Sequence, residues 1–290
     1  MKILFIIPGS GDSFYCGNCF RDNLQATALR KAGHDVIIMP LYLPLKQPSF
    51  QGDTPLFFPA TTYYAAQKFF RKTRMPRWIQ RITGSNRMLD LASSLSGTTS
   101  AEGMEDMTLS MITGEDSAFT EQVTPMINWI RDEEIPDIIH LSSTLLVGIA
   151  KTLRQHLDIP IICSVQDEEV WIDSLNKVHA AVAWQAIADN VRYISHFVTT
   201  SEFYKKTAKE KIPQISKLEV IYPAVDKGKY ASSVYPESPV IGFFYRMNRA
   251  NGLDILAEAF VDLKKRNTIP ALKPKIGGGN AGKHQRFHKE

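Results

Sequence analysis

The stretch Lys2-Ile3-Leu4-Phe5-Ile6-Ile7-Pro8-Gly9 opens the chain and decides its fold. Its apolar run has no polar alternation, which is typical of a strand buried on both faces of a parallel sheet. A glycine-bearing turn, a helical stretch over residues 18–32 and a second apolar run over residues 36–39 follow. Gly33 stands where a helix C-cap belongs. This β-α-β unit indicates the start of a doubly wound α/β sheet.

The same alternation of strands and helices continues to about residue 221. A long helix is predicted over residues 173–195, with Val178 and Val182 among its inward-facing side chains. Ser201 is predicted to be the N-cap of the helix that follows. The further strands are predicted at residues 137–141, 160–165, 197–200 and 218–221. Residues 1–235 are therefore expected to form one Rossmann-like domain with a parallel sheet.

A second domain is predicted to open at Pro239. Residues 240–244 read as a strand, residues 253–265 as a helix and residues 272–276 as the start of another strand. One β-α-β unit is too small to bury a core of its own. Residues 239–290 are therefore interpreted as the incomplete beginning of a second Rossmann-like domain.

Composition narrows the functional classes. With 44% hydrophobic and 22% charged residues in 290, the chain matches a soluble globular protein, and no run of 18 apolar residues predicts a membrane span. No signal-peptide pattern follows Met1, and three cysteines make no disulfide framework, so a cytosolic compartment is expected. A net charge of +4 does not suggest a nucleic-acid binder.

Ligands of an open parallel sheet bind beyond the carboxyl ends of its strands, so the loops that follow the strands are the candidate sites. The first of these loops, residues 8–18, carries Gly9 and Gly11 and leads into a helix N-terminus, where free N–H groups attract anions or sugar hydroxyls. A β-α turn without a ligand is the alternative. Cys16 and Cys19 at this helix start have the spacing of a dithiol oxidoreductase, with simple packing as the alternative.

Three later loops also hold unusual polar residues. Gln166-Asp167-Glu168-Glu169 follows a buried strand, and His140 ends the strand before it. Arg246 ends the first strand of the second domain, where an arginine can bind a diphosphate through two hydrogen bonds. The alternatives are a solvated acidic helix cap, a structural histidine and a solvated arginine.

Residues 63–87 mix cations with aromatic side chains and contain no acidic residue. Such a stretch is expected to contact an anionic membrane surface or an anionic acceptor. An ordinary helical cover with a wet basic face is the alternative. The cations are Lys68, Arg71, Lys72, Arg74, Arg77, Arg81 and Arg87.

Taken together, these pieces resemble a GT-B glycosyltransferase of the retaining family 4 type, over nearly the whole chain. The order and spacing of the motifs carry the resemblance. The matching segments are the opening strand with its glycine loop, Leu29-Arg30-Lys31-Ala32-Gly33-His34-Asp35-Val36, Pro136-Asp137-Ile138-Ile139-His140, Thr199-Thr200-Ser201-Glu202, Val220-Ile221-Tyr222-Pro223, Ile241-Gly242-Phe243-Phe244-Tyr245-Arg246 and Asn251-Gly252-Leu253-Asp254.

The resemblance implies transfer of a sugar from a nucleotide-diphosphate donor to an acceptor hydroxyl with retained configuration. It implies no metal and no cofactor, and the acceptor is expected to be a glycan or a lipid-linked molecule. Side chains and helix N-termini stabilise the leaving diphosphate. The assigned residues are Gln166 and Asp167 for catalysis, Gly9, Gly11, Arg246 and Asn251 for the donor, and Cys16, Gly17, Asn18, Arg21, His140 and Tyr222 for the acceptor.

The sequence departs from the family pattern in three places. Asn251 stands where a lysine is usual, and Gln166 stands where a histidine often follows the strand. The donor motif Glu-x7-Glu is expected beyond residue 290, so this chain is expected to bind donor poorly. The alternative function is a non-catalytic binding module, or a thiol-redox protein that uses Cys16 and Cys19.

Overall fold

A computed structural model describes most of the chain in two compact units, Met1–Val225 and Asp226–Glu290. The described residues are 1–9, 17–42, 46–47, 50–51, 54, 57, 104–115, 117–133, 135–229, 236–245, 247 and 249–278.

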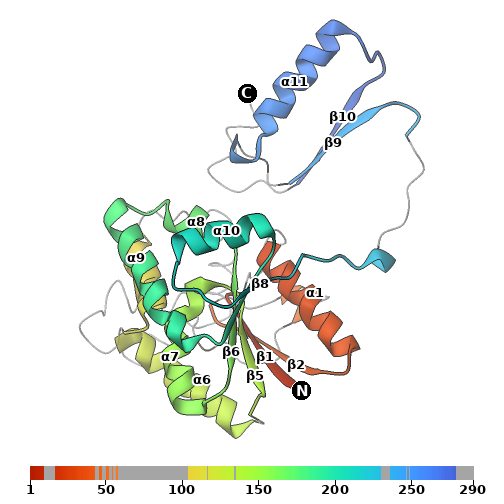
Figure 1. The fold of residues 1–290 in the computed structure, drawn as a ribbon. Helices are drawn as coiled ribbons and strands as arrows, with labels where there is room; N and C mark the ends of the chain where they lie inside the picture. Colours follow the sequence, from red (N-terminus) through yellow and green to blue (C-terminus); the bar gives the residue numbers. More distant parts are fainter. Residues whose placement is uncertain are drawn as a thin grey trace, which may run out of the picture. The chain divides into compact units, whose positions relative to one another are not determined.

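The first unit is built on a six-stranded sheet in the order β2-β1-β5-β6-β7-β8, and every neighbouring pair is parallel (Figure 1). The predicted α/β class and parallel sheet are therefore confirmed. The strands are β1 (Lys2–Ile7), β2 (Asp35–Pro40), β5 (Ile138–Leu141), β6 (Ile161–Val165), β7 (His196–Thr199) and β8 (Leu218–Val220). A short antiparallel pair, β3 (Lys46–Gln47) and β4 (Phe50–Gln51), stands apart from this sheet.

Helices cover both faces of the sheet. Successive residues of the apolar strand β1 point to opposite faces, so each face has apolar side chains that a helix can bury. Ile3, Phe5 and Ile7 pack with Ala26 of α1 (Gly17–Lys31), whereas Leu4 and Ile6 belong to a larger core with the other helices. Figure 1 shows α1 on one side of the sheet and α6, α7 and α9 on the other. These other helices are α5 (Glu105–Thr113), α6 (Ser117–Asp132), η1 (Thr144–Ile149), α7 (Ala150–Leu157), α8 (Glu168–Ile172), α9 (Lys177–Asn190), η2 (Val191–Tyr193) and α10 (Glu202–Lys211).

The long helix predicted over residues 173–195 starts later than expected, and its predicted inward face is right at Ile187 and wrong at Val178 and Val182. Helix α8 ends at Ile172, and α9 begins after Asn176, whose side chain accepts a hydrogen bond from the backbone N–H of His179 at 3.1 Å. Val178 is 72% exposed and Val182 is exposed as well. The buried positions of α9 are Ala183, Ile187 and Asn190. Asn190 faces α5, where its side chain donates a hydrogen bond to the carbonyl of Ile112.

Helix α5 and η1 approach each other so closely that only glycine fits at their contact. A Cβ atom on Gly148 would lie 2.2 Å from the carbonyl oxygen of Met111. A Cβ atom on Gly114 would lie 2.2 Å from the carbonyl oxygen of Gly148. Both contacts are far shorter than atoms tolerate, so this glycine pair fixes the position of η1, which begins directly behind the loop that follows β5.

The second unit is a single β-α-β element with little buried surface. Strands β9 (Val240–Phe244) and β10 (Lys273–Gly277) pair in parallel, and α11 (Leu253–Arg266) connects them after η4 (Arg249–Asn251). Only Leu253 and Leu272 are buried among its described hydrophobic residues. Another short helix, η3 (Lys227–Lys229), precedes β9. Across the described residues of both units, we find no helix with the length and apolar character needed to cross a bilayer.

Candidate functional site

The carboxyl ends of β1, β5, β6 and β7 form one end of the sheet, which we call the carboxyl edge. There the start of α1 meets the loop that follows β6, because Gln166 donates a hydrogen bond from Nε2 to Oδ1 of Asn18. Asp167 follows with a left-handed backbone (φ 57°). Burial and the nearby Glu169 raise the pKa of Asp167, whereas Arg21 lowers it. Three predicted site residues, Asn18, Gln166 and Asp167, are thus brought together.

Arg21 joins α1 to the loop that follows β5. Its Nη2 lies 2.5 Å from Oδ1 of Asp22 and donates to the carbonyl of Ser142 at 3.0 Å. Asp22 is 1% exposed, and burial raises its pKa while Arg21 opposes that shift. The guanidinium predicted to bind an acceptor therefore makes structural contacts at the carboxyl edge.

His140 lies inside the sheet, one residue before the end of β5. Its Nε2 shares a hydrogen bond of 2.9 Å with Oγ of Ser164, and its ring packs against Phe5 at 4.5 Å between centroids. Burial, helped by Arg21, lowers the pKa of His140 to about 3. The imidazole is therefore neutral at pH 7 and serves as a hydrogen-bonding group.

Glu168 is the most extensively bonded side chain at this edge. Its Oε1 accepts from Oγ of Ser143 and from the backbone N–H of Thr144, both at 3.0 Å. Its Oε2 accepts from the backbone N–H of Gln166 at 2.5 Å and lies 3.3 Å from Oη of Tyr204. Burial raises the pKa of Glu168 to about 7, and the donors of Ser143, Thr144 and Gln166 limit the shift.

Buried polar atoms without a hydrogen-bond partner gather at the carboxyl edge. Such atoms are rare in proteins and often mark a place where a ligand or water binds. Five of the seven found among the described residues belong here or to α1 beside it: Asp22 Oδ2, His140 Nδ1, Ser142 Oγ, Thr144 Oγ1 and Thr199 Oγ1. This edge therefore offers polar groups that the described protein atoms leave unsatisfied.

Of the other predicted site residues, Gly9 and Gly17 flank the first loop at the carboxyl edge, whereas Tyr222 and Asn251 lie elsewhere in the chain. Gly9 has the left-handed conformation (φ 82°) that favours glycine, and Gly17 begins α1. Tyr222 is 66% exposed beyond β8, two strands away from β6. Asn251 ends η4 in the second unit. Gly11, Cys16, Arg246 and residues 63–87 lie outside the described residues, and the membrane contact of that stretch stays a prediction.

The thiol groups do not favour redox chemistry. Cys19 is 3% exposed in the first turn of α1, although an attacking thiolate must be accessible. Cys163 is buried in β6, and its burial together with Glu168 raises the pKa of its thiol. Within the described part of the chain, no cluster of three or more metal-ligating side chains occurs.

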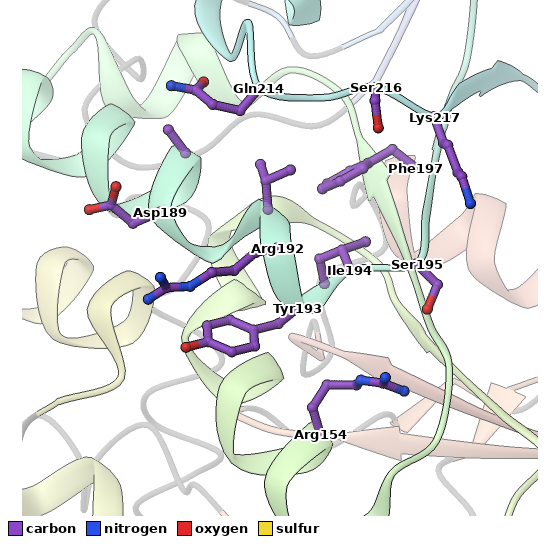
Figure 2. Close-up of a pocket in the computed structure, with 12 residues that line it drawn as sticks. Arg154, Asp189, Arg192, Tyr193, Ile194, Ser195, Phe197, Gln214, Ser216 and Lys217 are labelled. Atoms are coloured by element: carbon purple, nitrogen blue, oxygen red, sulfur yellow. The ribbon is translucent and has the colours of Figure 1, made fainter.

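A cavity of about 690 Å³ lies at the opposite end of the sheet, where the chain enters β7 and β8. Figure 2 shows its polar rim, in which the guanidinium of Arg192 extends outward beside the ring of Tyr193, 5.0 Å from the ring centroid. Arg154 donates to the carbonyl of Ile159 at 3.0 Å. We call this the amino-edge cavity; it is lined by Arg154, Ala188, Asp189, Val191, Arg192, Tyr193, Ile194, Ser195, Phe197, Gln214, Ser216 and Lys217.

Sequence reasoning did not assign several residues that build the carboxyl edge. Ser142, Ser143 and Thr144 form a run of three hydroxyls directly after β5, a signal that could have been used. Glu168 stands in a run of acidic residues, for which a solvated helix cap is one of two interpretations. The buried Asp22 and the contact of Tyr204 with Glu168 have no local signal, since both depend on partners distant in sequence.

Comparison with known proteins gives structural matches alone. No family model and no curated protein matches this sequence. Sucrose-phosphate synthase from Thermosynechococcus elongatus aligns with a TM-score of 0.56 and 13% identity, over 96% of this chain and 63% of that protein. HepE from Anabaena, solved with UDP-glucose, aligns with a TM-score of 0.48 and 13% identity, over 100% of this chain and 63% of that protein. An alpha-glucosyltransferase solved with UDP and DNA aligns with a TM-score of 0.46 and 13% identity, over 100% of this chain and 60% of that protein.

This chain therefore spans less than two thirds of the length of these three proteins. With identities this low, the alignments speak to architecture. The alignment with sucrose-phosphate synthase, at a TM-score of 0.56 over 96% of this chain, shows that the two proteins share an α/β architecture. The chain has the Rossmann-like α/β fold of GT-B glycosyltransferases.

Proposed function

We propose that the chain is the acceptor-side part of a glycosyltransferase, together with the start of its nucleotide-sugar domain. The reaction is transfer of a sugar from a nucleotide-diphosphate donor to an acceptor hydroxyl, with retention of configuration as in family 4. The acceptor is a glycan or a lipid-linked molecule. The structural similarity to sucrose-phosphate synthase, by its name an enzyme of sugar synthesis, supports the class of reaction.

The observation that carries this proposal is the concentration of polar groups at the carboxyl edge. Asn18 and Gln166 meet there across 148 residues of sequence, beside Asp167 and the unsatisfied hydroxyls of Ser142 and Thr144. Hydroxyl, amide and carboxylate groups are the partners that sugar hydroxyls need. Their place beyond the ends of parallel strands is where ligands of open α/β sheets bind.

In this proposal the site residues are assigned to different parts of the two substrates. The amide of Gln166 and the carboxylate of Asp167 contact the sugar that is transferred, and the amide of Asn18 binds the acceptor. The backbone around Gly9 and Gly11 approaches the donor phosphates at the start of α1, since free N–H groups at a helix N-terminus bind anions. Arg246 and Asn251 of the second unit are assigned to the donor diphosphate.

The test is binding of nucleotide sugars to the 290-residue chain. We expect weak binding of at least one of UDP-glucose, UDP-galactose or GDP-mannose, detected by saturation-transfer NMR. Gln166→Ala should weaken that binding roughly tenfold, because it removes hydrogen bonds made in a dehydrated site. Gln214→Ala is the matched control, since this glutamine lines the amino-edge cavity at the opposite end of the sheet.

Two results would contradict the proposal. One is the absence of a saturation-transfer signal from any of these sugars at millimolar concentration. The other is equal weakening by Gln166→Ala and Gln214→Ala, which would move the binding site away from the carboxyl edge. A coupled assay for released nucleoside diphosphate, run with glycan and lipid-linked acceptors, then measures transfer itself.

A further inference from the structure

The two carboxylate oxygens of Glu168 serve different loops. Oε1 accepts two hydrogen bonds from the loop that follows β5, through Ser143 and Thr144. Oε2 accepts the backbone N–H of Gln166 in the loop that follows β6. Glu168 is 2% exposed, so water does not compete for these donors. One side chain therefore holds two strand-end loops of the candidate site together.

We propose that Glu168 is a proton-operated positioning residue: its carboxylate fixes the loop that carries Gln166, and a proton on Oε2 releases that loop. The proposal deepens the proposed function and rests on it for the use of the site. Gln166 is affected because its own backbone N–H bonds to Oε2, while its side chain bonds to Asn18. Loss of the backbone bond frees the amide that would contact the sugar.

The surroundings of Glu168 decide which oxygen takes the proton. Oη of Tyr204 lies 3.3 Å from Oε2, accepts the backbone N–H of Glu168 and donates to Glu169. A proton on Oε2 can therefore be donated to Oη of Tyr204, which keeps a free lone pair. Oε1 is a poorer place for the proton, because the Thr144 N–H can only donate and Oγ of Ser143 already accepts the N–H of Leu145.

Burial brings the titration of Glu168 close to neutral pH, and several titratable and charged groups lie around it. Asp167 and Glu169 are its acidic neighbours in sequence, and the charge of Glu168 raises the pKa of the Cys163 thiol in β6. Arg21 of α1 is the cation of this edge, where it pairs with Asp22. Burial raises the pKa of Glu168 to about 7 and also raises that of Tyr204, so the phenol stays protonated as the carboxyl group titrates.

Amide hydrogen exchange of the ligand-free chain, measured by NMR between pH 5.5 and 8, tests the proposal. Observed rates are divided by the intrinsic rate of each amide. Protection of the Gln166 amide should rise roughly tenfold as pH increases through about 7, because a protonated Oε2 is a hydroxyl oxygen and a poor acceptor, whereas Oε1 remains a carbonyl oxygen. Protection of the Thr144 amide should change little, because Oε1 keeps its donors in both states.

Glu168→Gln separates the two loops. The amide oxygen is expected to stay with Ser143 and Thr144, which places the NH₂ group against the N–H of Gln166. The variant should therefore show low Gln166 protection at every pH and normal Thr144 protection. Glu169→Gln is the control, because Glu169 contacts Tyr204 and neither loop amide. It should keep the wild-type pH profile.

A pH-independent Gln166 amide in the wild-type chain would overturn the proposal, and so would equal pH responses of Gln166 and Thr144. The wild-type measurement decides even if Glu168→Gln does not fold. No sugar is present in this experiment, so its outcome is separate from that of the nucleotide-sugar titration. Binding without a pH response in the exchange data would sustain the proposed function and refute the positioning role.

Discussion

The two ends of the sheet differ in what they bury. The carboxyl edge contains ionisable and hydroxyl side chains that are almost fully enclosed, such as Asp22, Ser142 and Glu168, which are 0–2% exposed. The amino-edge cavity is open to solvent, its cations lie on an accessible rim, and Asp189 and Lys217 are exposed. Its floor is apolar, with Ile194 and Phe197 buried.

An open cavity and a cluster of buried polar groups therefore respond differently to ligands and to substitutions. An accessible charge is well solvated and contributes little to stability or specificity. A buried polar group has lost water, so its partners strongly affect both the fold and any ligand. The carboxyl edge should therefore respond strongly to single substitutions, and the amino edge weakly.

The largest difference is expected between two aspartates that pair with arginine. Asp22→Ala should lower the free energy of unfolding by about 4 kcal/mol, because it removes the carboxyl group that pairs with Arg21 in a largely enclosed place and leaves that guanidinium without a partner. Asp158→Asn, which breaks the pair of Arg154 with the 92% exposed Asp158, should change it by less than about 0.5 kcal/mol. Urea unfolding at pH 7 measures both, and equal effects would contradict the comparison.

The next largest effect is a pH dependence caused by Glu168. Its folded-state pKa of about 7 lies above the ordinary 4.5, so the folded protein binds more protons between these values. Stability should therefore fall as pH rises from 4.5 to about 7, by about 3 kcal/mol in total, and then stay level.

Unfolding curves at a series of pH values measure this dependence. Glu168→Gln should flatten the stability curve over this window, because the variant has no proton to lose there. Asp189→Asn, on the rim of the amino-edge cavity, should keep the wild-type curve. A wild-type curve that is already flat between pH 4.5 and 7 would show that Glu168 is ionised in the folded state throughout.

Two serines provide a matched pair of smaller effects. Ser143→Ala should cost about 2 kcal/mol, because its hydroxyl donates to Glu168 and also accepts the N–H of Leu145 at the start of η1. Ser195→Ala removes one long bond of 3.3 Å from the N–H of Ile161 and should cost about 0.5 kcal/mol. Thermal unfolding of the two variants at pH 8 compares them, and a larger loss for Ser195→Ala would reverse the order.

The smallest effect is expected at the rim of the amino-edge cavity. Arg192→Ala removes a cation over the ring of Tyr193 and should cost about 0.5 kcal/mol, the usual size of an exposed contact of this kind. Nucleotide-sugar binding should be unchanged, as saturation-transfer NMR can show. Loss of binding in this variant would place a ligand in the amino-edge cavity instead.

The strands of the six-stranded sheet were predictable because they are short, mostly apolar runs bounded by Pro, Gly or polar residues, as in β1. The short strands β3 and β4 had no such signal. The face of α9 was not predictable from hydrophobicity. Val178 is exposed although it is apolar, and Asn190 is buried although it is polar, because Asn190 satisfies the carbonyl of Ile112 across 78 residues.

The candidate site shows the same limit. Asn18 and Gln166 could be proposed together because strand-end logic places their loops at one edge. The contacts of Glu168 could not, since the Ser143, Thr144 and Gln166 donors come from two loops and the phenol of Tyr204 comes from α10. Local sequence shows a run of acids there, and only the assembled fold shows that one of them is enclosed.

β1 has a neighbouring strand on each side, and this affects how the protein folds during its synthesis. β1 pairs with β2, which begins 28 residues after β1 ends, and also with β5, so that Ile3 meets Ile138. On the ribosome, the second edge of β1 stays without its partner until β5 has been synthesised. Closing so long a loop slows folding much more than it lowers stability, because its entropic cost grows only logarithmically with length. Nascent chains of this protein therefore display an apolar strand edge during much of their synthesis, a period in which chaperone binding competes with aggregation.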